Sequence, residues 1–227
     1  MKICVFSAFT DMIPELVAAT EPLRRYYCMK HGYEFLTQPL PGTGCNEDEK
    51  YGFKRLSLVI ELLKSNAYDW IWVVGCDVLI TNLNIKLESL IDDAFGMVVG
   101  TEPTGSGMDS YLVQRKQGGL ELLEKLFTYR LAPIGCAHEQ STLDALIKED
   151  PEVTKSVKLL PQRKLNAYKY ESLSAYGFLS PGFLTGTDFL GNSGEWQPGD
   201  FVLHTPGLPY SEQKLLLFEK AGPLIQF

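Results

Sequence analysis

The sequence lacks the features of membrane-spanning and nucleic-acid-binding proteins. Its 227 residues contain no apolar run approaching the roughly 20 residues needed to cross a bilayer. The amino terminus, Met1 to Phe6, is too short for the apolar core of a signal peptide. Basic residues are outnumbered: the chain has 21 Lys and Arg and 28 Asp and Glu, which gives a net charge of −7. Clustered positive charge supplies most of the affinity for a phosphate backbone, so we expect a soluble protein with no nucleic-acid partner.

Paired cysteines are also missing. The five cysteines are odd in number and show no recurring spacing, and most lie among apolar residues. This pattern favours free thiols in a reducing compartment, and we therefore expect a cytoplasmic protein. Hydrophobic residues make up 45% of the chain and charged residues 22%, which is ordinary for a globular protein, and the length suits one domain.

The opening of the chain has the shape of a nucleotide-binding unit without its usual loop. Residues 2–8 and 33–37 have strand character, and the helix between them is expected to end at His31 and Gly32. A strand, a helix and a strand of this length form one right-handed crossover, which predicts a parallel sheet in an α/β fold. No Gly-x-Gly-x-x-Gly or Gly-Lys-Ser/Thr loop follows the first strand, so the dinucleotide-binding and P-loop classes lose their main support.

The most informative stretch that is present runs from Trp70 to Asn82. Its first part is continuously apolar, without alternation of polar and apolar residues, and so predicts a strand covered on both faces. The run ends on Asp77, which we expect to be exposed. A carboxylate at the carboxyl end of such a strand lies in the crevice where α/β sheets bind ligands. The alternative is that Asp77 only caps a turn.

A second candidate ligand follows a late strand. Residues 200–204 predict a strand that ends in His204, and Gly207 in the next turn would let a phosphate come close. Asp77 and His204 together would leave a divalent ion open positions for diphosphate oxygens and water. Such a mixed oxygen and nitrogen set suits Mn²⁺, with Mg²⁺ as the alternative. A structural role for a single histidine remains open.

The rest of the chain alternates helices, strands and irregular segments. A helix over 137–147 presents His138, Glu139 and Gln140 in its first turn, and Thr142 stands where a zinc-protease helix needs a second histidine. Residues 101–107 are small and Gly-rich and predict a mobile loop, and 171–196 predict irregular structure. Further helices are expected over 51–65, 85–91, 119–129 and 209–221, and further strands over 95–100, 109–114 and 157–160.

Five stretches together resemble a known group. They are Tyr51-Gly-Phe-Lys54-Arg-Leu, Trp70 to Asn82, His138-Glu139-Gln140-Ser-Thr-Leu, Leu160-Pro-Gln162-Arg163-Lys-Leu-Asn166-Ala-Tyr168, and Gly199-Asp-Phe-Val-Leu-His204-Thr-Pro-Gly207. In this order the chain resembles a GT-A glycosyltransferase and is most similar to glycosyltransferase family 34. The resemblance implies an α/β, Rossmann-like fold with a central, mostly parallel mixed sheet flanked by helices. It also implies a single GT-A-like domain over 1–227, with a nucleotide-binding half of about residues 1–100 and an acceptor-binding half over 101–227.

The resemblance also implies an activity and its residues. The expected reaction is transfer of a hexose or pentose from a nucleotide sugar, with a UDP-sugar favoured, to a glycan acceptor with retention of configuration. The implied metal ligands are Asp77 and His204, and the implied catalytic residues are Glu139 and Gln140, close to the anomeric carbon. The donor-binding residues implied in the same way are Ala8, Phe9, Lys54, Gly75, Cys76, Asp77, Gly207 and Lys214.

The sequence departs from the family pattern in three ways. Gly75 replaces the first carboxylate of the Asp-x-Asp metal motif, and the family's Asn-Ser-Gly is not reproduced around Gly107 to Asp109. The family's membrane anchor and stem have no counterpart, as expected for a soluble bacterial or viral enzyme in a host cytoplasm. The alternatives are a nucleotide-sugar or carbohydrate-binding protein that has lost catalysis, or a nucleotide-sugar hydrolase. For Lys54 and Lys214, the alternative to donor binding is that they are surface lysines.

Overall fold

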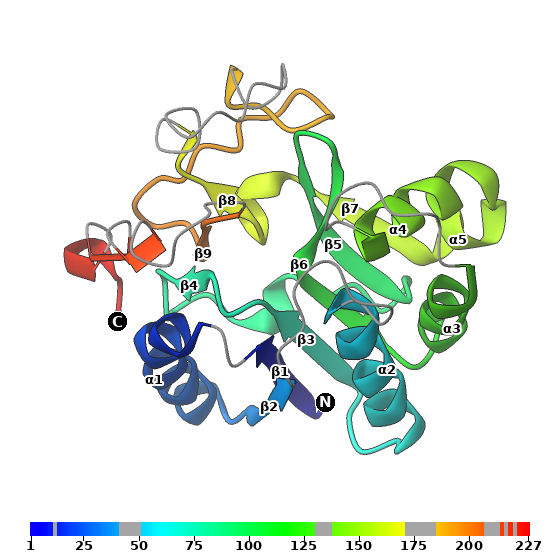
Figure 1. The fold of residues 1–227 in the computed structure, drawn as a ribbon, viewed down its shortest axis with the longest axis horizontal. Coiled ribbons are helices and arrows are strands. Elements are labelled where there is room, and N and C mark those ends of the chain that lie inside the picture. The colour runs from blue at the N-terminus through cyan, green and yellow to red at the C-terminus, as the bar shows by residue number, and fades with distance from the viewer. Residues whose placement is uncertain are drawn as a thin grey trace.

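A computed structural model describes residues 1–10, 13–40, 51–129, 138–170, 185–206, 214–215, 218–219 and 222–227 (Figure 1). The α-helices are α1 (Pro14–His31), α2 (Tyr51–Lys64), α3 (Gly119–Tyr129), α4 (His138–Glu149) and α5 (Pro151–Ser156). The strands are β1 (Ile3–Thr10), β2 (Glu34–Leu40), β3 (Trp70–Val74), β4 (Val78–Ile80), β5 (Met97–Glu102), β6 (Gly105–Gln114), β7 (Val157–Leu160), β8 (Ala167–Tyr168) and β9 (Val202–His204). Short 3₁₀ helices cover Leu87–Ser89, Gln162–Lys164 and Gly222–Leu224.

The central sheet is mixed and mostly parallel, as the sequence predicted. Its six strands lie in the order β2-β1-β3-β6-β5-β7. Strand β1 pairs in parallel with β2 and β3, and β5 pairs in parallel with β7, whereas β6 runs antiparallel to both of its neighbours. A second sheet has the order β4-β9-β8. The antiparallel β6 matters for the site, because its middle residues Asp109 and Ser110 lie beside the carboxyl end of β3.

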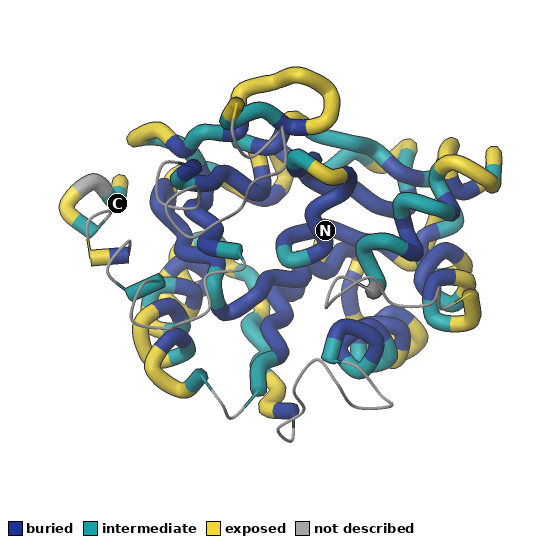
Figure 2. The backbone as a smooth tube through the Cα atoms, turned by 45° about the horizontal axis from the view of Figure 1, so that its top comes forward, coloured by how far each residue is buried: buried dark blue, intermediate teal, exposed yellow. Residues whose placement is uncertain are grey.

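The central sheet is covered on both faces, which explains the continuous apolar run of β3. Ile71 and Val73 pack into one cluster with residues of α2, α3 and α4, whereas Trp70, Trp72 and Val74 pack into another with α1, β4 and β9. Figure 1 shows the same arrangement, with α2 to α5 on one side of the sheet and α1 with the small sheet on the other. Strands β1, β3, β5 and β6 are buried along most of their length, and Figure 2 shows the buried chain at the centre of the molecule with exposed residues around it.

Three local predictions are corrected by the structure. Residues 101–107 do not form a mobile loop, because β5 extends to Glu102 and β6 begins at Gly105, which makes a tight hairpin. Residues 85–91 contain only the 3₁₀ turn Leu87–Ser89. Asp77 is not exposed, since only 17% of its side chain is accessible beneath Lys214 and His204.

Other predictions are confirmed or lie outside the described part. Helix α3 and strand β7 have the predicted bounds, and Gly32 ends α1 with a left-handed φ of 73°. Most of the predicted helix over 209–221 and the segment 171–184 lie outside the described residues. Within the described ranges, no helix combines the length and the apolar character that a bilayer crossing requires.

Candidate active site

The turn between β3 and β4 carries Gly75, Cys76 and Asp77, and its backbone is held from both sides. The buried guanidinium of Arg24, on α1, donates to the carbonyl oxygens of Gly75 and Val78. The hydroxyl of Thr20 donates to the Cys76 carbonyl over 3.1 Å. On the opposite strand, the Asp109 carbonyl accepts from the Gly75 amide over 2.7 Å. These bonds fix the direction in which the Asp77 side chain leaves the sheet.

The carboxylate of Asp77 lies against two cationic or ionisable groups. Its Oδ2 atom is 2.6 Å from Lys214 Nζ and 3.5 Å from His204 Nε2. Burial opposes ionisation of this carboxyl, but the ammonium of Lys214 and the neighbouring His204 outweigh that effect and hold its pKa well below the usual value. Asp77 therefore carries a negative charge throughout the physiological pH range.

His204 reaches Asp77 because β9 pairs antiparallel with β4, which places His204 opposite Val78. Its Nδ1 lies 2.6 Å from Asn166 Oδ1. The Asn166 amide nitrogen donates to the Tyr168 hydroxyl, so the amide oxygen faces the ring and Nδ1 carries the proton in the neutral imidazole. Nε2 then presents its lone pair. That atom is buried and has no hydrogen-bond partner.

A buried polar chain continues behind His204. The Tyr168 hydroxyl donates to Glu102 Oε2 over 2.5 Å, and the Gln140 amide donates to Glu102 Oε1. Burial raises the pKa of Glu102, although these donors and Thr104 partly offset the effect. Gln140, predicted as catalytic, thus reaches the hairpin between β5 and β6 rather than the Asp77 carboxylate.

The other predicted catalytic residue, Glu139, belongs to a second ion-pair cluster. Arg55 is 1% exposed and contacts Glu139 Oε1 and Asp109 Oδ1, each at 3.1 Å. Burial raises the pKa of Glu139, while Arg55 acts in the opposite direction. Gly52 leaves room for this carboxylate, because a β-carbon at position 52 would overlap it. The position of Glu139 therefore depends on its ion pair with Arg55 and on the space that Gly52 leaves for its carboxylate.

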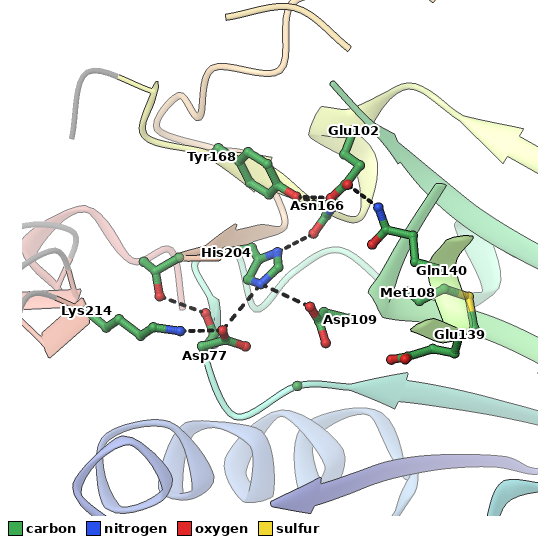
Figure 3. Close-up of polar contacts among 12 residues, drawn as sticks. Asp77, Glu102, Met108, Asp109, Glu139, Gln140, Asn166, Tyr168, His204 and Lys214 are labelled. Atoms are coloured by element: carbon green, nitrogen blue, oxygen red, sulfur yellow. Dashed lines mark hydrogen bonds and ion pairs between the residues drawn. The ribbon is translucent and has the colours of Figure 1, made fainter. Parts of the chain in front are cut away.

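The two clusters meet at His204, whose Nε2 is also 3.7 Å from Asp109 Oδ2. In Figure 3 the side chains of Lys214, Asp77, His204 and Asp109 point toward one another, with Asn166 behind the imidazole ring. The polar contacts form one path through the residues Gln140, Glu102, Tyr168, Asn166, His204, Asp109, Arg55 and Glu139. The path begins and ends on adjacent residues of α4.

The remaining predicted donor-binding residues that the structure describes lie on β1, on α2 and in the turn between β3 and β4. Ala8 is buried near the end of β1, where its carbonyl accepts from the Tyr51 hydroxyl, and Phe9 beside it is half-buried. Burial raises the pKa of the Cys76 thiol to about 12. Lys54 is half-buried on α2, and its neighbour Arg55 is the basic residue of that helix that contacts the site. Gly207 lies outside the described residues.

Sequence reasoning did not assign a role to Arg55, Asp109, Asn166 or Glu102. A signal for Arg55 was available, since it stands three residues after Gly52 and four before Val59, on the buried face of α2. Asn166 lay within a stretch that resembles the family but had no role attached to it. Glu102 was placed in the segment predicted to be a mobile loop.

His204 Nε2 and Asp77 Oδ2 offer a nitrogen and an oxygen ligand to a divalent cation. The imidazole nitrogen is buried without a hydrogen-bond partner and faces carboxylate oxygens of Asp77 and Asp109 at 3.5 and 3.7 Å. Among the described residues, no group of three or more His, Cys, Asp or Glu side chains is placed so that it could hold a metal ion. In this arrangement the ammonium of Lys214 neutralises Asp77.

A family match and the fold of solved structures identify the chain as a glycosyltransferase of the GT-A fold. The sequence model of the galactosyl transferase GMA12/MNN10 family matches residues 93–213, just over half of the chain. The chain belongs to this family. The matched region includes Asp109, Glu139, Gln140 and His204 but begins after Asp77. Among curated protein sequences, none matches this chain.

Solved structures support the fold. A glycosyltransferase involved in the glycosylation of the major capsid of PBCV-1 is 18% identical, with 97% of this chain and 100% of that chain covered and a TM-score of 0.69. The galactosyltransferase LgtC, solved with donor and acceptor sugar analogs, is 11% identical over 98% of this chain and 95% of its own, with a TM-score of 0.55. The apo form of GlyE from Streptococcus pneumoniae is 14% identical over 99% of this chain and 62% of its own, with a TM-score of 0.58.

Proposed function

We propose that this glycosyltransferase is metal-dependent and retaining, and that it moves a hexose or pentose from a UDP-sugar to a glycan acceptor. The observation that carries the proposal is the buried, unpartnered Nε2 of His204, which faces the ionised carboxylate of Asp77 at 3.5 Å. An acceptor nitrogen beside a carboxylate is a poor arrangement unless a positive charge lies between them. A divalent cation supplies that charge.

The chemistry of sugar transfer explains why a cation is needed. Cleavage of the bond between the sugar and the diphosphate leaves negative charge on the diphosphate oxygens. Bound Mn²⁺, or Mg²⁺ in its place, supplies Lewis-acid stabilisation of that charge. Asp77 and His204 would hold the ion. Lys214, whose pKa stays raised by Asp77 despite burial, would add a second positive charge near the leaving group.

We assign the remaining catalytic roles to two residues at the start of α4. Glu139 and Gln140 would lie on the sugar side and stabilise the positive charge that develops at the anomeric carbon. In a retaining transfer with attack from the leaving-group side, a diphosphate oxygen accepts the proton of the acceptor hydroxyl, so no side chain has to act as the base. Uracil would lie near the end of β1. We assign the further donor contacts to Ala8, Phe9, Lys54, Gly75, Cys76 and Gly207.

The proposal also includes how the chain is divided between nucleotide binding and acceptor binding. Residues 1–227 would form one domain, in which about residues 1–100 bind the nucleotide and 101–227 bind the acceptor. The family description names galactosyl transfer, and a similar structure is that of a glycosyltransferase involved in the glycosylation of the major capsid of PBCV-1. UDP-galactose is therefore the first donor to test, and a protein-linked glycan is a reasonable acceptor class.

The test is a panel of UDP- and GDP-sugars, assayed with and without Mn²⁺ for released nucleoside diphosphate and for sugar attached to added glycans. We expect one UDP-sugar to be turned over only with the metal. Asp77→Asn should lower that turnover by about 10²–10³-fold, because it removes charge at the leaving group. Equal rates with and without metal, or an unchanged rate in Asp77→Asn, would contradict the proposal.

Gly75 favours a second candidate, a nucleotide-sugar-binding protein that has lost catalysis, because the first carboxylate of the family motif is missing there. Such a protein would bind one donor in calorimetry and release no diphosphate. A hydrolase would release diphosphate at the same rate with and without a glycan acceptor. The same panel separates all three candidates.

A further inference from the structure

The side-chain amide of Gln140 has two chemically opposite ends, and its contacts fix which end is turned toward Glu102. The amide nitrogen donates to Glu102 Oε1 and lies 3.4 Å from Thr104 Oγ1. An ionised carboxylate only accepts hydrogen bonds, so the nitrogen of the amide rather than its oxygen faces Glu102. In Figure 3 the amide oxygen of Gln140 points away from Glu102, to the side on which Asp109 and His204 lie.

The direction of this amide matters for sugar transfer. When the bond between the sugar and the diphosphate breaks, positive charge develops at the anomeric carbon. The oxygen end of an amide dipole stabilises such a charge, whereas the N–H end destabilises it. We propose that Glu102 is a positioning residue that holds the nitrogen of Gln140 and thereby leaves the amide oxygen to face the sugar. The inference rests on the proposed function, because it concerns the role assigned there to Gln140.

Glu102 can hold the amide because its own carboxylate is fixed. It is the last residue of β5 and is 9% exposed. Its Oε2 accepts from the Tyr168 hydroxyl over 2.5 Å, and its Oε1 accepts from the Thr104 hydroxyl over 2.7 Å as well as from Gln140. A buried carboxylate with donors on both oxygens keeps one orientation, because turning it would leave donors unpaired.

The hairpin that carries Glu102 is fastened to α4, the helix that carries Gln140. Glu102 pairs with Gly105 across the turn between β5 and β6. The next residue, Ser106, donates its backbone amide to Asp144 Oδ1 over 2.9 Å. Asp144 follows Gln140 by four residues, so the two side chains leave the same face of α4. A β-carbon at Gly105 would overlap the Asp144 carboxylate, so the glycine lets the hairpin approach the helix.

The amide oxygen of Gln140 is left for a ligand. Gln140 is half-buried, and among the described residues its side-chain oxygen accepts no hydrogen bond. Turning the amide over would break the contacts of its nitrogen and place its oxygen beside the Glu102 carboxylate. An acceptor atom that is held in one direction and has no partner is available to a bound sugar.

The first test is the steady-state turnover of the best nucleotide sugar by the full chain. Glu102→Met removes the acceptor for the Gln140 nitrogen and leaves the amide free to turn over. We expect kcat to fall about 10–100-fold, with the KM of the donor sugar within about twofold of the unaltered protein. The matched control is Glu149→Met, the same substitution at an exposed position of α4, which should keep both constants. An unchanged kcat in Glu102→Met would overturn the inference.

The contact itself is tested without turnover by nuclear magnetic resonance of the Gln140 side-chain amide, identified by its absence in Gln140→Ala. Glu102→Gln keeps the volume of the side chain and removes its charge. We expect the Gln140 amide protons to lie apart from those of exposed glutamines, and to move toward them in Glu102→Gln, because a bond to a charged acceptor becomes a weaker one to a neutral acceptor. Resonances that do not change in Glu102→Gln would overturn the inference.

A double-mutant cycle separates positioning of the amide from a general effect on the fold. In Gln140→Ala no amide remains to be positioned, so adding Glu102→Met should change kcat by less than about twofold. Losses that multiply, in proteins that circular-dichroism melting shows to be folded, would overturn the inference. A full rate in Gln140→Ala would overturn both this inference and the role of Gln140 in the proposed function. A slow Gln140→Ala beside a Glu102→Met of full rate would leave the proposed function in place and overturn only the role of Glu102.

Discussion

Two buried arginines flank the Gly75 turn, and their partners differ in charge. Arg24 is 2% exposed and hydrogen-bonds two backbone carbonyls and the Ser7 hydroxyl, all of them neutral. Arg55 is 1% exposed and is paired with two carboxylates. Burial lowers the pKa of Arg24, whereas Asp109 and Glu139 outweigh burial and raise that of Arg55. Arg24 thus holds the backbone of the turn, and Arg55 balances the negative charge of two carboxylates at the site.

The largest effect is expected for Arg55→Met. Removing the guanidinium leaves Glu139 and Asp109 without a counter-ion, and breaking a buried ion pair in this way lowers the free energy of unfolding by about 3–5 kcal/mol. The pKa of Glu139 is already raised by burial, and it will rise further without Arg55. Because this carboxyl binds its proton more tightly when folded, the stability it contributes is present at low pH and is lost as the pH rises through the raised pKa.

We therefore expect Arg55→Met to lose less stability near about pH 5 than near about pH 8, relative to the unaltered protein. Urea unfolding at both pH values measures the difference. Adding Glu139→Gln should remove part of the pH dependence. A loss of stability that is the same at both pH values would contradict the assigned ion pairs.

Arg24→Met is expected to have a smaller effect that does not depend on pH. It leaves the Gly75 and Val78 carbonyls without this donor, and the net loss in unfolding free energy should be about 2–3 kcal/mol. No carboxylate accepts a hydrogen bond from Arg24 among its described contacts, so the same urea series should give equal losses at both pH values. A pH-dependent loss would show that the two arginines do not differ as described.

Gly52→Ala disturbs the Arg55 cluster without changing any charge. A methyl group at position 52 would overlap the Glu139 carboxylate and push it from its place beside Arg55. Misplacement of a catalytic group should lower turnover of the best UDP-sugar by about 10–100-fold, with donor affinity largely kept. Ser57→Ala on the same helix is the matched control, since within the described part of the chain the Ser57 hydroxyl bonds only the Lys54 carbonyl. Equal rates for the two variants would remove Glu139 from the reaction.

The smallest effect is expected for Lys214→Gln, which removes the cation that competes for Asp77 Oδ2. Without UDP, Mn²⁺ affinity should rise, because the ammonium that competes for Asp77 Oδ2 is removed. UDP affinity should fall, because a positive charge near the diphosphate is lost. Calorimetric titrations with each ligand test the two directions. Weaker Mn²⁺ binding would show that Lys214 supports the metal site.

Much of the fold could be predicted from the sequence because local patterns determine it. The continuous apolar run at residues 70–74 requires cover on both faces, and Gly32 relieves the left-handed end of α1. Asp77 and His204 were predicted at strand ends, and the structure brings them together. The roles of the site residues in sugar transfer remain predictions.

Asp109 could not be found in this way because its position depends on the direction of β6. In a parallel sheet, the start of that strand would lie at the edge opposite the end of β3. The antiparallel pairing of β6 with β3 instead places Asp109 beside Gly75. A single-sequence pattern predicts that a strand exists but does not give its direction. The same limit applies to Glu102, which lies at the other strand of this hairpin.

Pulsed electron paramagnetic resonance of Mn²⁺ bound to the protein and UDP tests the central claim most directly. A coordinated imidazole nitrogen modulates the Mn²⁺ signal, and the chain has only 3 histidines. We predict a nitrogen coupling that changes when histidine is labelled with ¹⁵N, disappears in His204→Gln, and persists in His31→Gln and His138→Gln. Bound Mn²⁺ without a nitrogen coupling, or a coupling that survives in His204→Gln, would contradict the assignment of His204 and Asp77 as the metal-binding pair.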